Sequence, residues 1–306
     1  MCNEKDKFLK GIIIAAVSEF IFGMSFVFIK MVVSDVTVMT LLAWRNIIGF
    51  TTMTIVIVLG ILKLNLKGKN LKPLLLLCCF QPVSYYIFET IGVKMTTASE
   101  SGMFFASIPI VTMLFSAVFI RDMPNRKQVL FMFVTVSGGI IAAVTSGLDT
   151  SGNLAGYFFL LFAMFSESAF AITSQTMKNF TSTEKTYIQI CAGTFVFTAC
   201  AIIEQGFSGT LKESAMLIFT DRTFLICILF LGIGCNVIGF FMANYALPII
   251  GATRRAAFGG IGTITAIIGG VCVLHESFTG IQFFATILIL IGAYGVNFSG
   301  SRKKEE

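Results

Sequence analysis

The sequence predicts an all-α membrane protein with ten transmembrane helices in two inverted five-helix repeats. Of its 306 residues, 56% are hydrophobic and only 12% are charged, whereas an ordinary soluble domain is about 25% charged. The apolar residues come in blocks of about 20, the length at which a helix crosses a ~30 Å hydrocarbon layer. A soluble chain would also need a polar surface that this composition does not supply.

Ten apolar segments define the predicted spans, and the short connections between them favour antiparallel neighbours. Their long continuous runs disfavour a transmembrane β-barrel, whose strands alternate over about ten residues. In chain order the segments are 11–33, 38–62, 73–93, 98–120, 128–147, 154–177, 186–205, 223–247, 252–274 and 281–299. The seventh ends at Glu204 and Gln205, and the ninth begins next to Arg254 and Arg255.

Most of the 22 lysines and arginines fall on one side of this arrangement when the N-terminus is placed in the cytoplasm. The positive-inside rule then predicts that both termini are cytoplasmic. The net charge of +6 therefore reports orientation, and no clustered basic patch predicts nucleic-acid binding. The expected parts are a cytoplasmic N-terminus (1–10), a first repeat (11–147), a linker (148–153), a second repeat (154–299) and a cytoplasmic basic and acidic tail (300–306).

A repeated motif supports the division into two halves. "SEFIFGMSFVFIK" (18–30) and "SESAFAITSQTMK" (166–178) share the pattern S-E-x-x-F-x-x-[ST]-x-x-x-x-K. A second match pairs Ala98 with Ala252 and continues through the following apolar residues. Because five helices are an odd number, the second half would enter the membrane in the opposite direction, as in many secondary transporters. The alternative is chance similarity between apolar segments.

The motif places an acid and a base twice in apolar sequence. Glu19 and Glu167 fall in the middle third of their spans, where a charged carboxylate costs roughly 2.5–3.5 kcal/mol. Lys30 and Lys178 follow eleven residues later on the same helix faces, near opposite mouths. The glutamates are either proton carriers or structural groups that join helices, one of them paired with Arg45. The lysines either line the mouths or extend to the headgroups.

Further polar and aromatic residues complete the predicted site. Each has a structural alternative: Arg45 neutralising a glutamate, the outer acids forming a surface cluster, the aromatics packing, and the paired arginines anchoring the chain. Residues predicted for the substrate or proton pathway are Glu19, Glu167, Phe22, Phe26, Arg45, Tyr85, Tyr86 and Asn244. Residues predicted for a gate or mouth are Lys30, Lys178, Glu89, Glu100, Arg254 and Arg255.

Several classes of function find no support in the sequence. No Walker motif occurs, and neither H-E-x-x-H nor G-x-S-x-G is present, so we expect no enzyme activity, no catalytic residues and no ATP-driven transport. The eight cysteines show no metal-ligand spacing, and we expect neither a metal nor a cofactor. The expected partners are a small-molecule substrate and the lipid bilayer, with the chain acting as a monomer or homodimer and binding no nucleic acid.

Over residues 11–299 the chain resembles the drug/metabolite transporter superfamily, in the form built from two EamA repeats. The resemblance rests on the order of "AAVSEFIFGMSFVFIK", "LAWRN", "ASIPIVT" and "FFMANYALPIIGATRRAA". Glu19 also resembles the proton-carrying glutamate of small multidrug transporters. The sequence departs from the usual EamA pattern at "FIRDMPNRKQ" and at Gly262-Thr263, where a second proline is common.

The resemblance implies a bacterial inner-membrane carrier that exports amino acids or related metabolites by alternating access, with proton coupling. Two alternatives remain open. One is an extruder of cations or drugs on the same scaffold, which a negative cavity between Glu19 and Glu167 would favour. The other is a membrane sensor or scaffold that transports nothing.

Overall fold

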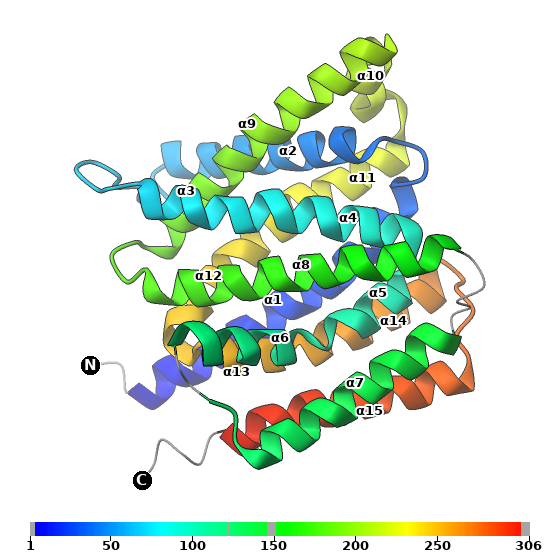
Figure 1. Cartoon of the computed structure of the whole chain (residues 1–306). Coiled ribbons are helices and arrows are strands. Elements are labelled where there is room, and N and C mark those ends of the chain that lie inside the picture. Colours follow the sequence, from blue (N-terminus) through cyan, green and yellow to red (C-terminus); the bar gives the residue numbers. More distant parts are fainter. Residues whose placement is uncertain (1–3, 121–122, 146–150, 301–306) are drawn as a thin grey trace.

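The structure, a computed structural model, describes residues 4–120, 123–145 and 151–300. In these ranges every regular element is a helix, and the helices form one bundle (Figure 1). The α-helices of the first half are α1 (Glu4–Val32), α2 (Val38–Val58), α3 (Lys72–Cys78), α4 (Tyr85–Met95), α5 (Ala98–Phe105), α6 (Ile108–Phe115) and α7 (Arg126–Thr145). Those of the second half are α8 (Ser151–Thr176), α9 (Ser182–Ser208), α10 (Leu211–Thr220), α11 (Arg222–Leu229), α12 (Phe240–Ile250), α13 (Ala252–Ala257), α14 (Gly259–Val273) and α15 (Gly280–Gly300).

Eight helical stretches in the described residues are long and apolar enough to cross a membrane. They are Asp6–Val32, Val38–Val58, Lys72–Met95, Ala98–Phe119, Leu154–Thr176, Ser182–Ser208, Arg222–Ile250 and Arg254–Val273. The apolar part of α15 is shorter, Gly280–Val296, and α7 is not among the eight. The chain is therefore a polytopic helical membrane protein, and the count of ten spans stays a prediction.

Successive spans alternate in direction across the bundle (Figure 1). Helix α1 begins and α15 ends at the same end of the bundle, on the left in Figure 1. We call this the terminal end and the other the far end. The connection between α8 and α9 lies at the terminal end, whereas α2 begins at the far end.

Several spans are interrupted within their length. Wide π-helical turns join α3 to α4 (η1, Cys79–Ser84), follow α6 (η2, Ser116–Ile120) and join α11 to α12 (η3, Phe230–Gly239). In η1, Gln81 has extended backbone angles because Pro82 follows it, and a residue before proline is disfavoured in the helical region. The helical ladder stops there, which frees the Gln81 carbonyl to accept a bond from Gln189 Nε2 at 3.1 Å.

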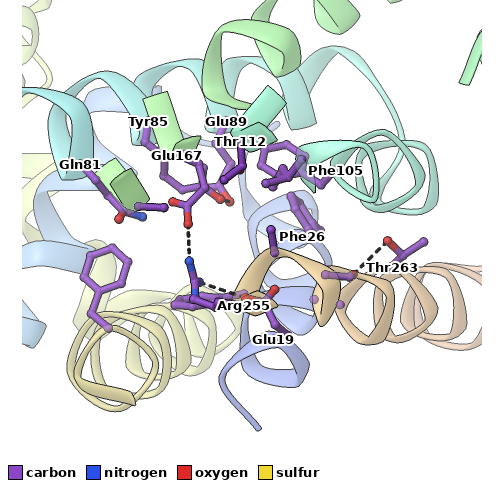
Figure 2. A pocket seen from close by; sticks show the side chains of 18 of the residues that line it. Glu19, Phe26, Gln81, Tyr85, Glu89, Phe105, Thr112, Glu167, Arg255 and Thr263 are labelled. Atoms are coloured by element: carbon purple, nitrogen blue, oxygen red, sulfur yellow. Dashed lines mark hydrogen bonds and ion pairs between the residues drawn. The ribbon is translucent and has the colours of Figure 1, made fainter. Parts of the chain in front are cut away.

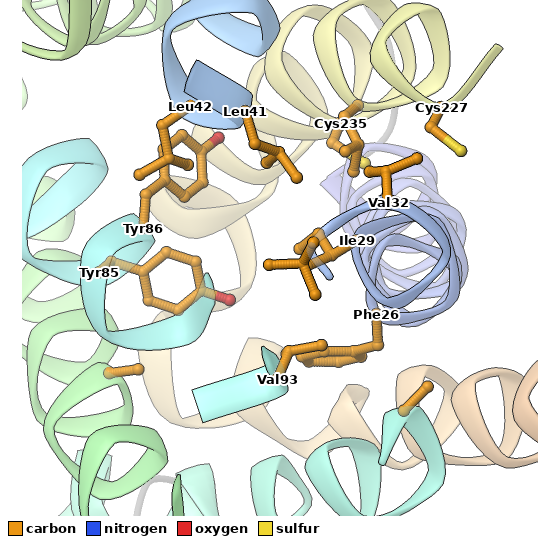
Figure 3. Packing of buried hydrophobic residues seen from close by; sticks show 14 of the residues in the cluster. Phe26, Ile29, Val32, Leu41, Leu42, Tyr85, Tyr86, Val93, Cys227 and Cys235 are labelled. Atoms are coloured by element: carbon orange, nitrogen blue, oxygen red, sulfur yellow. The ribbon is translucent and has the colours of Figure 1, made fainter. Parts of the chain in front are cut away.

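Helix α1 is central to the packing. It contacts α14, α12 and η3, and its side chains Phe26, Ile29 and Val32 join a buried apolar cluster with residues of α2 and α4 (Figure 3). Helices α7 and α15 pack mainly against each other and lie together at one edge of the bundle (Figure 1).

Three helix boundaries can be compared with the predicted parts of the chain. The expected connection after residue 205 contains a further helix, α10. Helix α9 continues to Ser208, and the chain reverses direction at Gly209, whose φ is +71°. Helix α1 already begins at Glu4, inside the segment assigned to a cytoplasmic N-terminus. Helix α8 begins at Ser151, so the expected linker is half helix, and the tail from residue 301 lies outside the described residues.

Candidate functional site

A cavity lies at the centre of the bundle, between α1, α4, α8 and the broken pairs α5–α6 and α13–α14. Its volume is about 50 Å³, which is room for a few water molecules. We call it the central cavity. Of the residues predicted for the pathway, the central cavity is lined by Glu19, Glu167, Phe22, Phe26, Arg45, Tyr85 and Tyr86.

Arg255 joins two glutamates from different halves of the chain (Figure 2). Its Nη2 lies 2.9 Å from Glu19 Oε1 on α1, and its Nη1 lies 2.6 Å from Glu167 Oε1 on α8. The Arg255 residue is 6% exposed, so this three-residue ion cluster is largely shielded from solvent. Arg255 was predicted for a gate or mouth; the structure instead places it between the two repeated glutamates.

Short helix α13 aims Arg255 inwards. Gly251, with φ +84°, turns the chain between α12 and α13, and the Ala252 amide donates to Gln175 Oε1 at 2.9 Å. Arg254 is one residue earlier, about 100° away around the helix. It is exposed and lies over the Phe8 ring at 5.3 Å, so the two neighbouring arginines face different surroundings.

A second buried ion pair lines the same cavity. Arg45 Nη1 lies 3.6 Å from Glu89 Oε2, and Arg45 Nε donates to Asn236 Oδ1 at 2.9 Å. Tyr85 donates to Glu89 Oε1 at 2.9 Å, and the Arg45 guanidinium lies 3.8 Å from the centre of the Tyr86 ring. Glu89 was predicted for a gate or mouth; it is buried beside Arg45, six residues before α4 ends at Met95.

Several polar atoms on the wall of the central cavity have no hydrogen-bond partner among the described residues. They are Arg45 Nη1, Gln81 Oε1, Glu89 Oε2 and Arg255 Nε. Buried polar groups are nearly always bonded, because burial without a partner costs about 1–3 kcal/mol. Arg45 Nη1 and Glu89 Oε2 face each other at 3.6 Å as an ion pair. Gln81 Oε1 and Arg255 Nε are therefore the open positions for water or for the polar groups of a bound solute.

Close backbone contact positions Glu19 against α14. A Cβ on Gly23 would lie 2.3 Å from the Gly262 carbonyl oxygen, and a Cβ on Gly262 would lie 3.1 Å from the Glu19 carbonyl. Only glycine allows two helices to approach this closely, a common device in membrane bundles. Thr263 also bonds across to the Gly102 carbonyl of α5 at 2.8 Å, which ties α14 to a second wall of the cavity.

The remaining predicted residues lie outside the central cavity. Lys30 donates to the carbonyls of Val93, Lys94 and Thr96, and so caps the end of α4. Glu100 forms a capping box with Thr97 at the start of α5. Both residues therefore bond to helix ends at the far end of the bundle, and their role in a gate or mouth stays a prediction.

Two further predicted residues, Asn244 and the exposed Lys178, line a separate cavity at the terminal end. Asn244 is 1% exposed, and its amide donates to Thr186 Oγ1 at 3.0 Å and to Gln189 Oε1 at 2.8 Å. It is therefore part of a buried polar cluster beside α9.

The sequence alone did not identify every lining residue of the central cavity. Gln81, Phe105, Ile108, Thr112, Phe240 and Thr263 also line it. Two of these residues lie next to interrupted helices, and such interruptions could have identified them. Gln81 precedes a proline in an apolar run, and Thr263 follows the break at Phe258. In the described residues no group of three or more histidine, cysteine, aspartate or glutamate side chains is arranged to hold a metal ion.

A Bacillus subtilis (strain 168) protein described as the uncharacterized transporter YcxC is 31% identical over 293 residues, covering 95% of this chain and 94% of that protein. A second uncharacterized transporter, from Archaeoglobus fulgidus, is 22% identical and covers 94% of this chain and 98% of its own length. Both descriptions are of transporters and not of enzymes.

One solved crystal structure has a TM-score of 0.66 and 15% identity, covering 95% of this chain and 98% of that one, which shows a shared fold. The model of the EamA-like transporter family matches residues 9–144 and again residues 154–298. These matches confirm the resemblance found in the sequence, and the chain, with a charged cavity at the centre of its helices, belongs to the EamA-like transporter family.

Proposed function

We propose that this membrane transporter is a proton-coupled secondary carrier that exports amino acids or related small metabolites by alternating access. It would lie in the cell (inner) membrane with both termini in the cytoplasm, as a monomer or homodimer. The observation that carries the proposal is the Arg255 guanidinium held between Glu19 and Glu167 in the central cavity.

The ion cluster has the chemistry that coupling requires. A glutamate carboxylate accepts either a proton or the ammonium group of an amino acid, and each competes with the other. Bound proton and bound substrate then exclude one another, so inward proton movement drives outward substrate movement. A substrate carboxylate would meet Arg255, which has one free Nε donor on the cavity wall in the described part of the chain.

An inverted repeat would give this site equal access to both sides. In support of it, the π-helical turns η1 and η3 interrupt the third span of each predicted half. The breaks between α5 and α6 and between α13 and α14 interrupt the fourth span of each. Pairs of interrupted helices at corresponding positions are typical of transporters whose binding site lies between the repeats.

The packing is also consistent with a two-fold relation between the halves. The spans that would be exchanged by such an axis contact each other: α2 packs on α9, α5 on α14 and α7 on α15. The α4–α8 contact likewise has a counterpart in the α1–α12 contact. The family model matches each half separately, in the same order.

A second candidate, extrusion of organic cations, is favoured by the charge balance of the central cavity. Three carboxylates, from Glu19, Glu89 and Glu167, face the two guanidiniums of Arg45 and Arg255. The aromatic wall would also attract a cation through its ring faces. The rings that line the cavity belong to Phe22, Phe26, Tyr85, Tyr86, Phe105 and Phe240.

Transport by purified protein in liposomes tests the proposal. An amino acid is added on the side of the liposome membrane that is equivalent to the cytoplasm. We expect a pH gradient that is acidic on the opposite side of the liposome membrane to drive its uptake. Glu19→Gln should abolish this gradient-driven flux and retain exchange of internal for external substrate, because Glu167 still holds Arg255. Glu213→Gln, on the exposed face of α10, is the matched control and should transport like wild type.

The same assay separates the alternatives. Gradient-driven flux in Glu19→Gln equal to wild type would overturn the proton role of this glutamate. Flux of organic cations such as tetraphenylphosphonium, with none of amino acids, would select the cation extruder. Absence of flux for amino acids, sugars and cations would select the non-transporting sensor or scaffold.

A further inference from the structure

A second cavity, of about 980 Å³, opens at the terminal end of the bundle between the start of α1, the α8–α9 connection and α12. We call it the vestibule. We infer that the vestibule binds the carboxylate group of the transported solute through the buried ammonium group of Lys185, before the solute reaches the central cavity. This inference rests on the proposed export function and narrows its substrates to solutes that carry an acidic group.

The charge of the vestibule wall is of one sign. Lys7, Lys178 and Lys185 line it, and no aspartate or glutamate is among its described lining residues. Lys7 and Lys178 are exposed and flank the opening. A concave wall lined by one sign of charge raises the local concentration of solutes of the opposite sign.

Lys185 differs from the other two lysines because it is buried. It is 2% exposed, and its Nζ donates to the Ser174 carbonyl at 2.6 Å and to Ser174 Oγ at 3.3 Å. None of the four ion pairs of the described residues includes it. An ammonium group has three donors, so one has no acceptor in the described part of the chain.

A buried charge without a counter-ion is costly, and proteins normally pair it. The acid nearest in sequence does not pair with Lys185. Glu184 accepts from Lys69 Nζ at 2.8 and 2.6 Å and from the Thr181 amide at 3.0 Å. The missing counter-ion is therefore one that comes from the vestibule.

Hydrogen bonds connect the vestibule to the central cavity. Asn244 lines the vestibule and accepts from Ser174 Oγ at 3.2 Å, the same hydroxyl that Lys185 contacts. Asn244 also donates to Gln189, which in turn donates to the carbonyl of Gln81 on the wall of the central cavity. The hydrogen-bonded side chains of Asn244 and Gln189 thus lie between a solute at Lys185 and the central cavity, where the proposed exchange takes place.

The anion is assigned to a solute carboxylate and not to a lipid phosphate because the ammonium lies inside the wall and not on the outer surface of the bundle. A soluble carboxylate reaches it through the open vestibule. A lipid headgroup would first meet the exposed Lys7 and Lys178 at the rim. The two sources are separated by experiment.

Binding of succinate, acetate and inorganic phosphate to the full chain in uncharged detergent tests the inference, by titration calorimetry at constant ionic strength. We expect saturable binding of at least one carboxylate, weakened at least ten-fold in Lys185→Met and less than three-fold in the rim control Lys178→Met. Lys185→Arg should restore binding, since it retains the charge.

A second variant guards against loss of folding. Thr183 lines the vestibule at the second position of α9, where an acidic residue stabilises a helix start. Thr183→Asp should therefore fold at least as well as wild type, place a negative charge on the vestibule wall and abolish carboxylate binding by charge repulsion. Its thermal unfolding midpoint reports folding separately from binding.

Three results would overturn the inference. They are absence of saturable binding of both succinate and acetate to wild type, equal binding by Lys185→Met or Thr183→Asp, and binding of phosphatidylglycerol in nanodiscs without binding of a soluble carboxylate. Gradient-driven flux in the liposome assay with unchanged affinity in both variants would refute the vestibule site and leave the proposed function standing. Carboxylate binding without any flux would do the reverse.

Discussion

Replacing Arg255 by methionine removes the cation between Glu19 and Glu167 and leaves two carboxylates a few ångströms apart in a largely buried site. Breaking a buried pair in this way costs roughly 3–5 kcal/mol, because the remaining charge keeps its desolvation penalty without its partner. The entropy of unfolding is about 2.1 cal/mol/K per residue, so for a chain of 306 residues each kcal/mol lowers the unfolding midpoint by about 1.6 °C. The expected decrease for Arg255→Met is therefore roughly 5–8 °C.

The compensated variant distinguishes this cause from lost packing. In the triple variant Arg255→Met, Glu19→Gln, Glu167→Gln no charge remains unpaired, and replacement of a whole buried ion cluster by neutral groups is often close to neutral in stability. We expect the triple variant to regain at least half of the lost midpoint, measured by thermal unfolding in the same detergent.

A pH series adds a second check on the same site. In Arg255→Met a proton on either carboxylate relieves the repulsion, so the stability gap to wild type should narrow as the pH falls from 8 to 5. A gap independent of pH, together with a triple variant as unstable as the single one, would refute the view that the charges of this cluster depend on one another.

Two further predictions concern contacts of helices α1 and α5, which contribute to the walls of the central cavity. Gly23→Ala should destabilise the protein by about 1–3 kcal/mol or more, because the added Cβ would lie 2.3 Å from the Gly262 carbonyl oxygen. The control in thermal unfolding is Gly139→Ala, whose added Cβ would have no atom within 4 Å. Equal destabilisation by the two substitutions would contradict the close-contact argument. Glu276→Ala should loosen the far end, since Glu276 accepts from the amides of Ala98 and Ser99 at 2.7 and 2.9 Å at the start of α5. Such a cap is worth about 0.5–2 kcal/mol, and faster amide hydrogen exchange confined to α5 would support this prediction, whereas unchanged exchange would contradict it.

The sequence alone determined that the protein lies in a lipid bilayer and which acidic residues are repeated in its two halves. Long continuous apolar runs with few charges favour a helical membrane protein over a barrel of short alternating strands, because backbone groups in lipid must be bonded within the chain. The doubled motif also marked Glu19 and Glu167, since an acid in mid-membrane is expensive and is retained for a reason. Both conclusions depend only on composition and spacing along one helix.

Tertiary structure alone decided which charges meet. The sequence presents Arg254 and Arg255 as equals, but a rotation of about 100° per residue sends one to the surface and the other between two glutamates. Glu89 likewise appeared to belong to an outer connection until its helix placed it against Arg45. These partners are far apart in sequence, and the break at Phe258 and the glycine contact between α1 and α14 set their distances, which no local pattern encodes.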